Sequence, residues 1–374
     1  MDGRHRRWSL RRPRLRLAPF RRPQPVARHR RDGGLRHRPH GQPPWARPSS
    51  PTGATGAPLA GQAGFGEAVG SFRGRVADFP EGEPDRPASA FLEPGNRWNA
   101  MLDAVSTFFS GVELDRVSSR DLARYDDTGI NWRVVEGYGR VIAGHGAGLA
   151  ARLGCEVRQI DRRGRRLRLE TSDGPITAGA VIVTLPSNVI AERPDFFLPA
   201  LPEKTRAAEG LPLGLADKLF LSLDGADEFE SESRAFGRTD TVATAAYHFR
   251  PFGRPKIEAY FGGSFAASLE KGGEGAFFDV AVAELTALFG SDLGRRLKPL
   301  GLHCWGTDPW ARGSYSCALP GRADDRAALA ASVEDRLFFA GEACSRDDYS
   351  TAHGAYRTGV AAAEQAITAR WKIA

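Results

Sequence analysis

Hydrophobic residues recur at helical spacing near residue 100 and again near the end of the chain. The first set falls at intervals of three and four, which predicts a helix over roughly 97–110 with one buried face. Its members are Trp98, Met101, Leu102, Val105, Phe108 and Phe109. The alanine-rich stretch 352–368 predicts a second helix, which follows a short apolar strand at 336–340.

The stretch 156–185 changes to the alternating period that strands show. Polar turns at 162–164 and 172–174 divide it into short strands, so we predict an antiparallel β-meander. It leads into the apolar run 180–185, which is typical of a strand buried on both faces. Another strand is expected over 215–223. Strands and helices in this order indicate an α/β fold.

Charge is distributed unevenly along the 374 residues. Residues 1–60 hold 15 arginines, no lysine and two acids, whereas 61–374 hold 37 basic and 43 acidic side chains. The body of the chain is therefore mildly acidic, and the overall charge of +7 gives no support for nucleic-acid binding. The Arg- and Pro-rich segment 1–64 shows neither periodicity nor enough apolar surface to fold. Three interpretations of it stand: a disordered basic arm, an inert tail, or the product of out-of-frame translation.

The sequence predicts neither a membrane span nor a secretory signal, because it has no run of 18 apolar residues and no apolar stretch after its first charges. No CxxC pair and no His/Cys cluster with zinc spacing is present. We therefore expect free thiols in a cytoplasmic protein and no metal site. The cysteines are Cys155, Cys304, Cys317 and Cys344.

The strand–loop–helix at the carboxy end carries the strongest chemical signal. A buried strand ends at Gly341 and Glu342, a polar loop follows, and a helix begins near Thr351 and Ala352. A helix amino terminus offers unpaired amides and the positive end of the helix dipole, which suits an electron-rich ring carbonyl. An ordinary βα unit would show the same composition.

This segment resembles the flavin motif of the flavin-containing amine oxidases, the family of monoamine oxidases, polyamine oxidases and lysine-specific histone demethylases. Three upstream blocks resemble the family in the same order: 131–139, 183–186 and 305–316. The resemblance implies an amine-oxidase-like two-domain α/β fold and FAD as the cofactor. The last block closely resembles the matching block of the demethylase and polyamine oxidase branches.

The resemblance assigns five positions to the cofactor. Val157 matches the position whose backbone holds the adenine, and Glu342, after Gly341, matches the acid beside the ribityl chain. Thr351 and Ala352 match positions against the pyrimidine edge of the flavin ring.

Four more residues match positions beside the flavin and the amine. Lys218 matches the lysine that holds a water near the flavin N5 atom, and burial in its strand would lower its pKa. An edge lysine that reaches solvent fits the same pattern. Trp305, Trp310 and Tyr315 match aromatic residues around the substrate, where ring faces can hold an amine by cation–π attraction. Simple core packing is the alternative for these three.

Two positions distinguish the branches of the family. Tyr315 matches one wall of the aromatic cage, but Thr351 stands where monoamine oxidases have the second tyrosine. Ser314 stands where covalently flavinylated members have cysteine. The chain therefore resembles the branch with half a cage and non-covalent FAD.

One element of the family pattern is missing. Family members begin with a strand, a GxGxxG turn and a helix that cradle the pyrophosphate, and this sequence shows no such unit. We therefore expect an incomplete Rossmann-like FAD-binding domain whose flanking strands are exposed. This domain would comprise 146–215 and 326–374, interleaved with a mixed-sheet substrate domain of 65–145 and 216–325, after the basic segment 1–64.

Two functional hypotheses remain. The first is an FAD-dependent amine oxidoreductase that passes hydride from a small amine to flavin and reduces oxygen to hydrogen peroxide. The second is a truncated or mistranslated, non-catalytic remnant that does not hold FAD. The sequence specifies neither the amine nor the oligomeric state.

Overall fold

The computed structural model describes residues 64–80, 82–126 and 133–373. All but the last residue of the predicted basic segment 1–64 lies outside these described residues, as do Asn131 and Trp132 of the block 131–139. Among the described helices, none is both long and apolar enough to cross a membrane.

A small helical cluster opens the described chain and confirms the helix predicted over 97–110. Its elements are α1 (Phe65–Ala77), η1 (Ala88–Phe91), α2 (Asn99–Ser110), η2 (Leu114–Arg116) and α3 (Ser119–Arg124). The apolar face of α2 is buried through Met101 and Leu102, whereas Phe109 on its other side is half exposed. Helix α2 ends at Gly111, whose backbone lies so close to Gly214 that a Cβ at Gly111 would come within 2.7 Å of it. This contact between Gly111 and Gly214 joins the helical cluster to the segment that leads into β6, a strand of the sheet described next.

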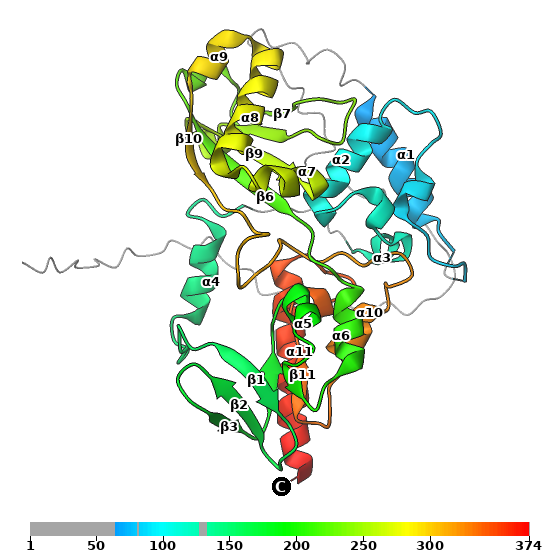
Figure 1. The fold of residues 1–374 in the computed structure, drawn as a ribbon. Helices are drawn as coiled ribbons and strands as arrows, with labels where there is room; N and C mark the ends of the chain where they lie inside the picture. The colour runs from blue at the N-terminus through cyan, green and yellow to red at the C-terminus, as the bar shows by residue number, and fades with distance from the viewer. Residues whose placement is uncertain (1–63, 81, 127–132, 374) are drawn as a thin grey trace, which may run out of the picture. The chain divides into compact units, whose positions relative to one another are not determined.

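A five-stranded sheet in the order β10-β6-β9-β8-β7 forms the largest layer (Figure 1). Its strands are β6 (Ala216–Leu223), β7 (Arg234–Phe236), β8 (Ala246–Phe249), β9 (Lys256–Gly262) and β10 (Leu297–Leu302). Helices α7 (Gly263–Glu270) and α8 (Gly273–Phe289) pack on it, followed by α9 (Ser291–Arg295); η3 (Ala226–Glu228) and η4 (Pro251–Gly253) lie in its loops.

The strand predicted over 215–223 is confirmed as β6, but the sheet around it is antiparallel throughout rather than mixed. The reason is the connectivity. The strands β8 and β9 are joined by a short turn around η4, and a short turn can only reverse the chain. Residues of β6 alternate in burial, so that Leu219 and Leu221 enter the core and Lys218 lies on the opposite face.

The predicted meander is confirmed as three antiparallel strands, β1 to β3, and the mixed sheet is found here because β5 pairs parallel with β1. The elements of this region are α4 (Tyr138–Gly146), β1 (Val157–Asp161), β2 (Leu167–Thr171), β3 (Ile176–Ala178), α5 (Ser187–Glu192), β5 (Phe197–Leu198) and α6 (Pro202–Glu209).

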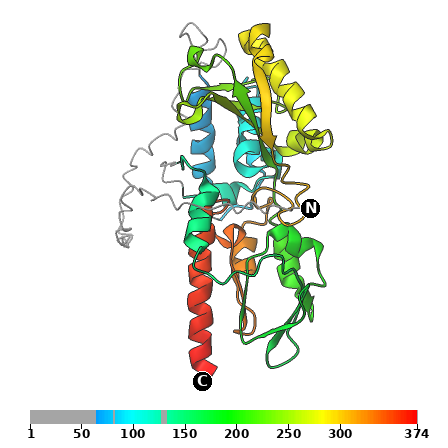
Figure 2. The same ribbon diagram turned by 90° about the vertical axis from the view of Figure 1, so that its left-hand side faces the viewer.

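The run 180–185 contains β4 (Val181–Val183), which pairs parallel with β11 (Leu337–Phe339) in a separate two-stranded sheet. The expectation of burial on both faces was wrong for β4, because Ile182 is 38 % exposed whereas Val183 is buried. The remaining elements are α10 (Asp325–Ala330), η5 (Glu342–Cys344) and α11 (Ala352–Ile373). Helix α11, the long helix predicted over 352–368, runs beside β4 and β11 (Figure 2).

Candidate functional site

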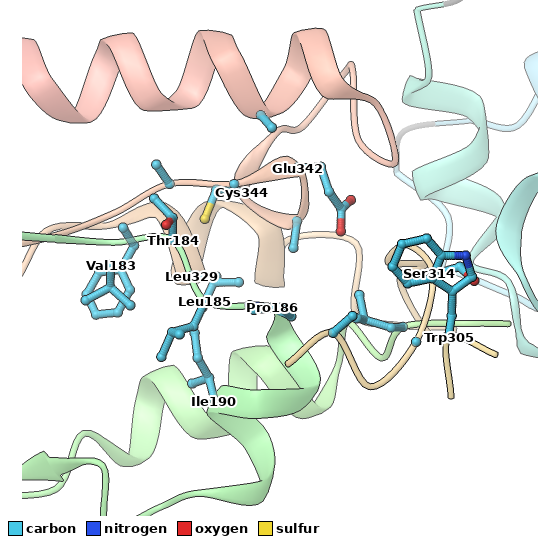
Figure 3. A pocket seen from close by; sticks show the side chains of 18 residues that line it. Val183, Thr184, Leu185, Pro186, Ile190, Trp305, Ser314, Leu329, Glu342 and Cys344 are labelled. Carbon is cyan, nitrogen blue, oxygen red and sulfur yellow. The ribbon is translucent and has the colours of Figure 1, made fainter. Parts of the chain in front are cut away.

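A cavity of about 340 Å³ lies where β4 and β11 end (Figure 3). Because the two strands are parallel, the loops that follow them meet at the same edge, which is where ligands bind in such sheets. The lining comes from the segments 183–186, 313–314 and 339–344, with Ile190, Leu213, Trp305, Ala311, Leu329 and Ala355. The volume and the apolar walls suit an organic ligand better than an ion.

The strand end at Gly341 and Glu342, two residues that the resemblance assigned to the cofactor, forms one wall of the cavity. Gly341 has a φ of 131°, and apart from its own atoms and those of its two chain neighbours no atom lies within 4 Å of the place where a Cβ would be, so this part of the backbone faces open space. The Thr358 hydroxyl donates to the Gly341 carbonyl at 2.9 Å and accepts from its amide at 3.0 Å. A flat ligand can therefore approach a backbone that α11 holds in place.

The start of α11 lies next to this wall. The Thr351 hydroxyl accepts a hydrogen bond from the Gly354 amide at 3.0 Å and donates to the Asp348 carbonyl. Thr351 and Ala352 themselves do not line the cavity, but Ala355, one turn further along α11, does. The amino end of a 22-residue helix thus adds its partial positive charge to the surroundings of the cavity.

Val157, predicted to contact the adenine, lies at the start of β1. It packs against the same hydrophobic core as Val183 and Phe339, but it does not line the cavity. Val157 therefore lies outside the cavity, in the sheet that contains β1 and not in the two-stranded sheet that leads to Gly341.

The three predicted aromatic residues occupy different environments. Trp305 lines the cavity and is 39 % exposed, whereas Trp310 is 67 % exposed and does not line it. Tyr315 follows the cavity residue Ser314; its hydroxyl donates to the Phe108 carbonyl and lies 2.9 Å from the Tyr260 hydroxyl, which acts as the donor to it. Burial and then Tyr260 raise the pKa of Tyr315 well above its ordinary value.

Ser314 is occupied by structural contacts at the cavity edge. Its hydroxyl accepts from the Ala216 amide at 2.8 Å and donates to the Ala216 carbonyl at 3.2 Å. The loop with the cavity-lining Gly313 and Ser314 is thereby joined to the first residue of β6, which carries Lys218.

Lys218 is exposed, as the solvent-reaching alternative expected, but it does not lie on an edge strand, because β6 lies between β10 and β9. Its amino group is 4.9 Å from the centre of the Tyr260 ring. Loss of hydration beneath the surrounding side chains lowers the pKa of Lys218. The Glu258 carboxylate opposes this effect, and the charges of Arg133 and Arg234 add to it.

A charged cluster surrounds Glu258 on this face, and we call it the sheet-face cluster. It consists of Arg133, Lys218, Glu232, Arg234, His248, Lys256 and Glu258. Burial would raise the pKa of Glu258, but nearby His248, 3.8 Å away, the hydrogen bond from Lys256 and the charges of Lys218 and Arg133 lower it to about 2. Arg133, the first described residue of the block 131–139, reaches this cluster by contacting Glu258 at 3.2 Å.

Two acids that the sequence did not single out hold the backbone beside Trp305. Asp217, next to Lys218 but fully buried on the other face of β6, accepts from the Trp305 amide at 3.2 Å. Glu270 accepts from the Gly306 amide at 2.8 Å. Burial raises the pKa of Asp217 to about 7, with Glu270 adding to the rise and the Trp305 amide opposing it.

A second network, which we call the buried network, holds Glu342. It consists of Asp121, Ser316, Arg326, Glu342 and Tyr349. Arg326 is fully buried and contacts both carboxylate oxygens of Asp121, at 2.7 and 2.8 Å. Asp121 and Arg326 are 205 residues apart in the sequence, and neither stands in a recognisable motif, so sequence reasoning missed them.

Comparison with known proteins agrees with this geometry. The family model described as flavin containing amine oxidoreductase matches residues 70–367. Polyamine oxidase 4 of Oryza sativa subsp. japonica is 32 % identical over 244 residues, which are 64 % of this chain and 49 % of the relative. Lysine-specific histone demethylase 1 homolog 2 of Arabidopsis thaliana is 32 % identical over 201 residues, 51 % of this chain and 27 % of the relative. The chain thus spans about half the length, or less, of the curated relatives that it matches.

A solved structure shares the fold. A cofactor-binding redesign of putrescine oxidase aligns with a TM-score of 0.63 at 15 % identity, over 80 % of this chain and 73 % of that one. The α/β, amine-oxidase-like fold expected from the sequence is confirmed by this likeness.

Proposed function

Because the chain belongs to the flavin containing amine oxidoreductase family, we propose that it is an FAD-dependent enzyme that oxidises a C–N bond of a small amine. The observation that carries the proposal is the cavity at the ends of β4 and β11, where an open glycine backbone and one oriented carboxylate meet. Non-covalent binding is proposed because a serine, Ser314, stands at the cavity edge.

The residues that line the cavity fit the flavin part of this cofactor. Gly341 leaves room for a flat ring against the backbone, Glu342 offers a carboxylate to a hydroxyl donor, and the amino end of α11 favours negative charge nearby. When bound, FAD supplies the redox chemistry by accepting hydride from the carbon beside the amine nitrogen and passing the electrons to molecular oxygen, which yields hydrogen peroxide. The side chains contribute binding, orientation and proton positions.

The remaining site residues other than Trp310 each have a proposed task. Trp305 covers the cavity and excludes water from it. Tyr315, which follows the lining residue Ser314 but does not itself line the cavity, holds this loop in place because its hydroxyl is bound on both sides. Lys218 holds a water or a proton at its Nζ atom, a task that its lowered pKa supports. Val157, Thr351 and Ala352 are proposed to contact more distant parts of the cofactor.

The location of the protein is also a proposal. The four cysteines are free, two of them buried, which supports a reducing compartment such as the cytoplasm.

The test is a titration of the purified full chain with FAD, followed by visible absorbance and by quenching of flavin fluorescence. We expect saturable binding and, after an amine is added without oxygen, bleaching of the flavin absorbance. The amines compared would be monoamines, diamines, polyamines and amino acids, with peroxide release measured in air. A chain that takes up no FAD would contradict the proposal and favour a non-catalytic protein.

A further inference from the structure

The carboxylate of Glu342 is held by three hydrogen bonds inside the protein. Its Oε1 atom accepts from the Ser316 amide at 3.1 Å, and its Oε2 atom accepts from the Ser316 hydroxyl and from the Ser350 amide, both at 2.7 Å. A carboxylate offers about four acceptor positions, so one is left for a donor in the cavity that Glu342 lines. The direction of that last position depends on the groups that hold the other three.

Ser316 is the residue through which this direction is set. It is fully buried, and its hydroxyl oxygen accepts a hydrogen bond from Arg326 Nη1 at 2.9 Å. Because Arg326 can only donate, the single hydroxyl hydrogen of Ser316 is left to donate to Glu342. Ser316 also accepts at its carbonyl from the Ser350 hydroxyl at 2.7 Å, so both serines that contact Glu342 are bound to each other.

The guanidinium group of Arg326 is in turn held in one orientation by its neighbours. Its Nε and Nη2 atoms form a two-point contact with the Asp121 carboxylate, and its guanidinium lies 3.8 Å from the centre of the Tyr349 ring. The Tyr349 hydroxyl donates to the Asp121 carbonyl at 3.1 Å. A fully buried ion pair contributes little net stability compared with apolar side chains of the same volume. What the Asp121–Arg326 pair provides instead is a hydrogen-bond donor of fixed direction, the Arg326 Nη1 atom, which points at Ser316.

We propose that Ser316, oriented by the buried Asp121–Arg326 pair, is a positioning residue that directs the free acceptor of Glu342 toward bound flavin. The inference rests on the proposed function, since it needs a flavin in the cavity. It assigns a task to a helix, α3, that does not line the cavity but supplies Asp121.

The experiment is a double-mutant cycle on FAD affinity, measured by fluorescence titration of the full-length apoprotein. The variants are Ser316→Ala, Glu342→Gln and the double variant. We expect Ser316→Ala to weaken FAD binding about tenfold, since a hydrogen bond to a charged group is lost. In the Glu342→Gln background the same change should alter the dissociation constant less than about twofold, because Ser316 acts through Glu342.

The matched control is Ser106→Ala, which also removes a buried serine hydroxyl, one that donates to the Val112 carbonyl at 2.9 Å away from the cavity. It should leave FAD affinity unchanged, while thermal unfolding of every apoprotein reports purely structural damage. Equal losses of affinity from Ser316→Ala in both backgrounds would overturn the inference alone. A wild-type chain that binds no FAD would overturn the proposed function, and the inference with it.

Discussion

The buried network and the sheet-face cluster both contain several charged groups, but they differ in how completely those groups are paired. In the buried network one acid, Asp121, contacts one base, Arg326, and both side chains are almost fully removed from water. The second acid of this network, Glu342, is held by the neutral donors of Ser316 and Ser350. In the sheet-face cluster four cations, Arg133, Lys218, Arg234 and Lys256, share two acids. Several of these groups remain in contact with solvent.

The difference in charge pairing indicates what each network can do. A buried acid–base pair such as Asp121 and Arg326 has one arrangement, because a displaced charge would be left without a partner in a medium of low polarity. It is suited to holding Glu342 in a fixed position. A cluster with more cations than acids can change partners when a ligand or a water arrives, since water screens each rearrangement. It is suited to the exposed face on which Lys218 lies.

The largest expected effect tests the buried side of the comparison. Asp121→Asn should lower the free energy of unfolding by about 3–5 kcal/mol, because it leaves the Arg326 charge buried and uncompensated. Urea denaturation at pH 7 measures this change. The control is Asp324→Asn, which breaks the ion pair between Asp324 and Arg124. The Asp324 side chain is 75 % exposed, so this variant should change the free energy of unfolding by less than about 1 kcal/mol. Similar costs for both variants would remove the distinction between the networks.

The next effect concerns Asp217, which is buried beside the exposed Lys218. Its pKa of about 7 lies above the ordinary value of 3.8, so the folded protein binds this proton more tightly than the unfolded chain does. Stability from this group is therefore present below pH 4 and lost as the pH rises through 7. Asp217→Asn should flatten the fall in stability between pH 4 and 7 by up to about 4 kcal/mol.

Chemical denaturation at several pH values measures this profile. Asp224→Asn, at an exposed position just after the same strand, is the control and should leave the profile as it is in the wild type. An unchanged slope in Asp217→Asn would show that Asp217 does not carry the proton.

A third prediction separates two lysines of the sheet-face cluster. Lys218→Met should slow the reaction of reduced flavin with oxygen about 100-fold, the scale of a lost proton-positioning group. Lys256→Met, on the same face but paired with Glu258 at 3.2 Å, should slow it less than about threefold. Stopped-flow absorbance of the reduced, FAD-loaded protein measures both rates. Equal losses would mean that the cluster acts through its total charge and not through Lys218.

The smallest expected effect distinguishes Trp305 from Trp310, for which the resemblance implied the same place around the substrate. Trp305→Ala should weaken FAD binding about tenfold, because Trp305 lines the cavity and its ring area would be lost. Trp310→Ala should change the affinity less than twofold, since Trp310 is 67 % exposed and lies outside the lining. Fluorescence titration with FAD measures both, and equal losses would place Trp310 against the cofactor.

Much of the site followed from local pattern. The strand that ends at Gly341 and the helix that follows it were predictable, because a short apolar run, a glycine and an alanine-rich stretch each act within a few residues. The placement of Lys218 on the face opposite Leu219 follows from the period of two in a strand. The period alone does not say whether that face is covered. In the structure Lys218 is exposed, whereas His248 and Glu258 on the same face are largely covered.

Other features depended on long-range contacts. The expected burial of β4 on both faces failed at Ile182, because an apolar run shows what a strand could bury and not which neighbours it receives. The antiparallel order of the five-stranded sheet was likewise set by which strands pair across the sheet, β6 with both β9 and β10.

By itself the sequence determined the α/β class, the main helices and strands, and the strand end at Gly341 and Glu342, because these arise from interactions between residues close together along the chain. Only the tertiary structure decided that Asp121 and Arg326 form a pair, that Ser316 links them to Glu342, and that Asp217 and Glu270 hold the backbone beside Trp305. The physical reason is that a charge becomes decisive only when burial removes water from it and a partner is brought within hydrogen-bond distance. Both conditions are set by packing between distant parts of the chain.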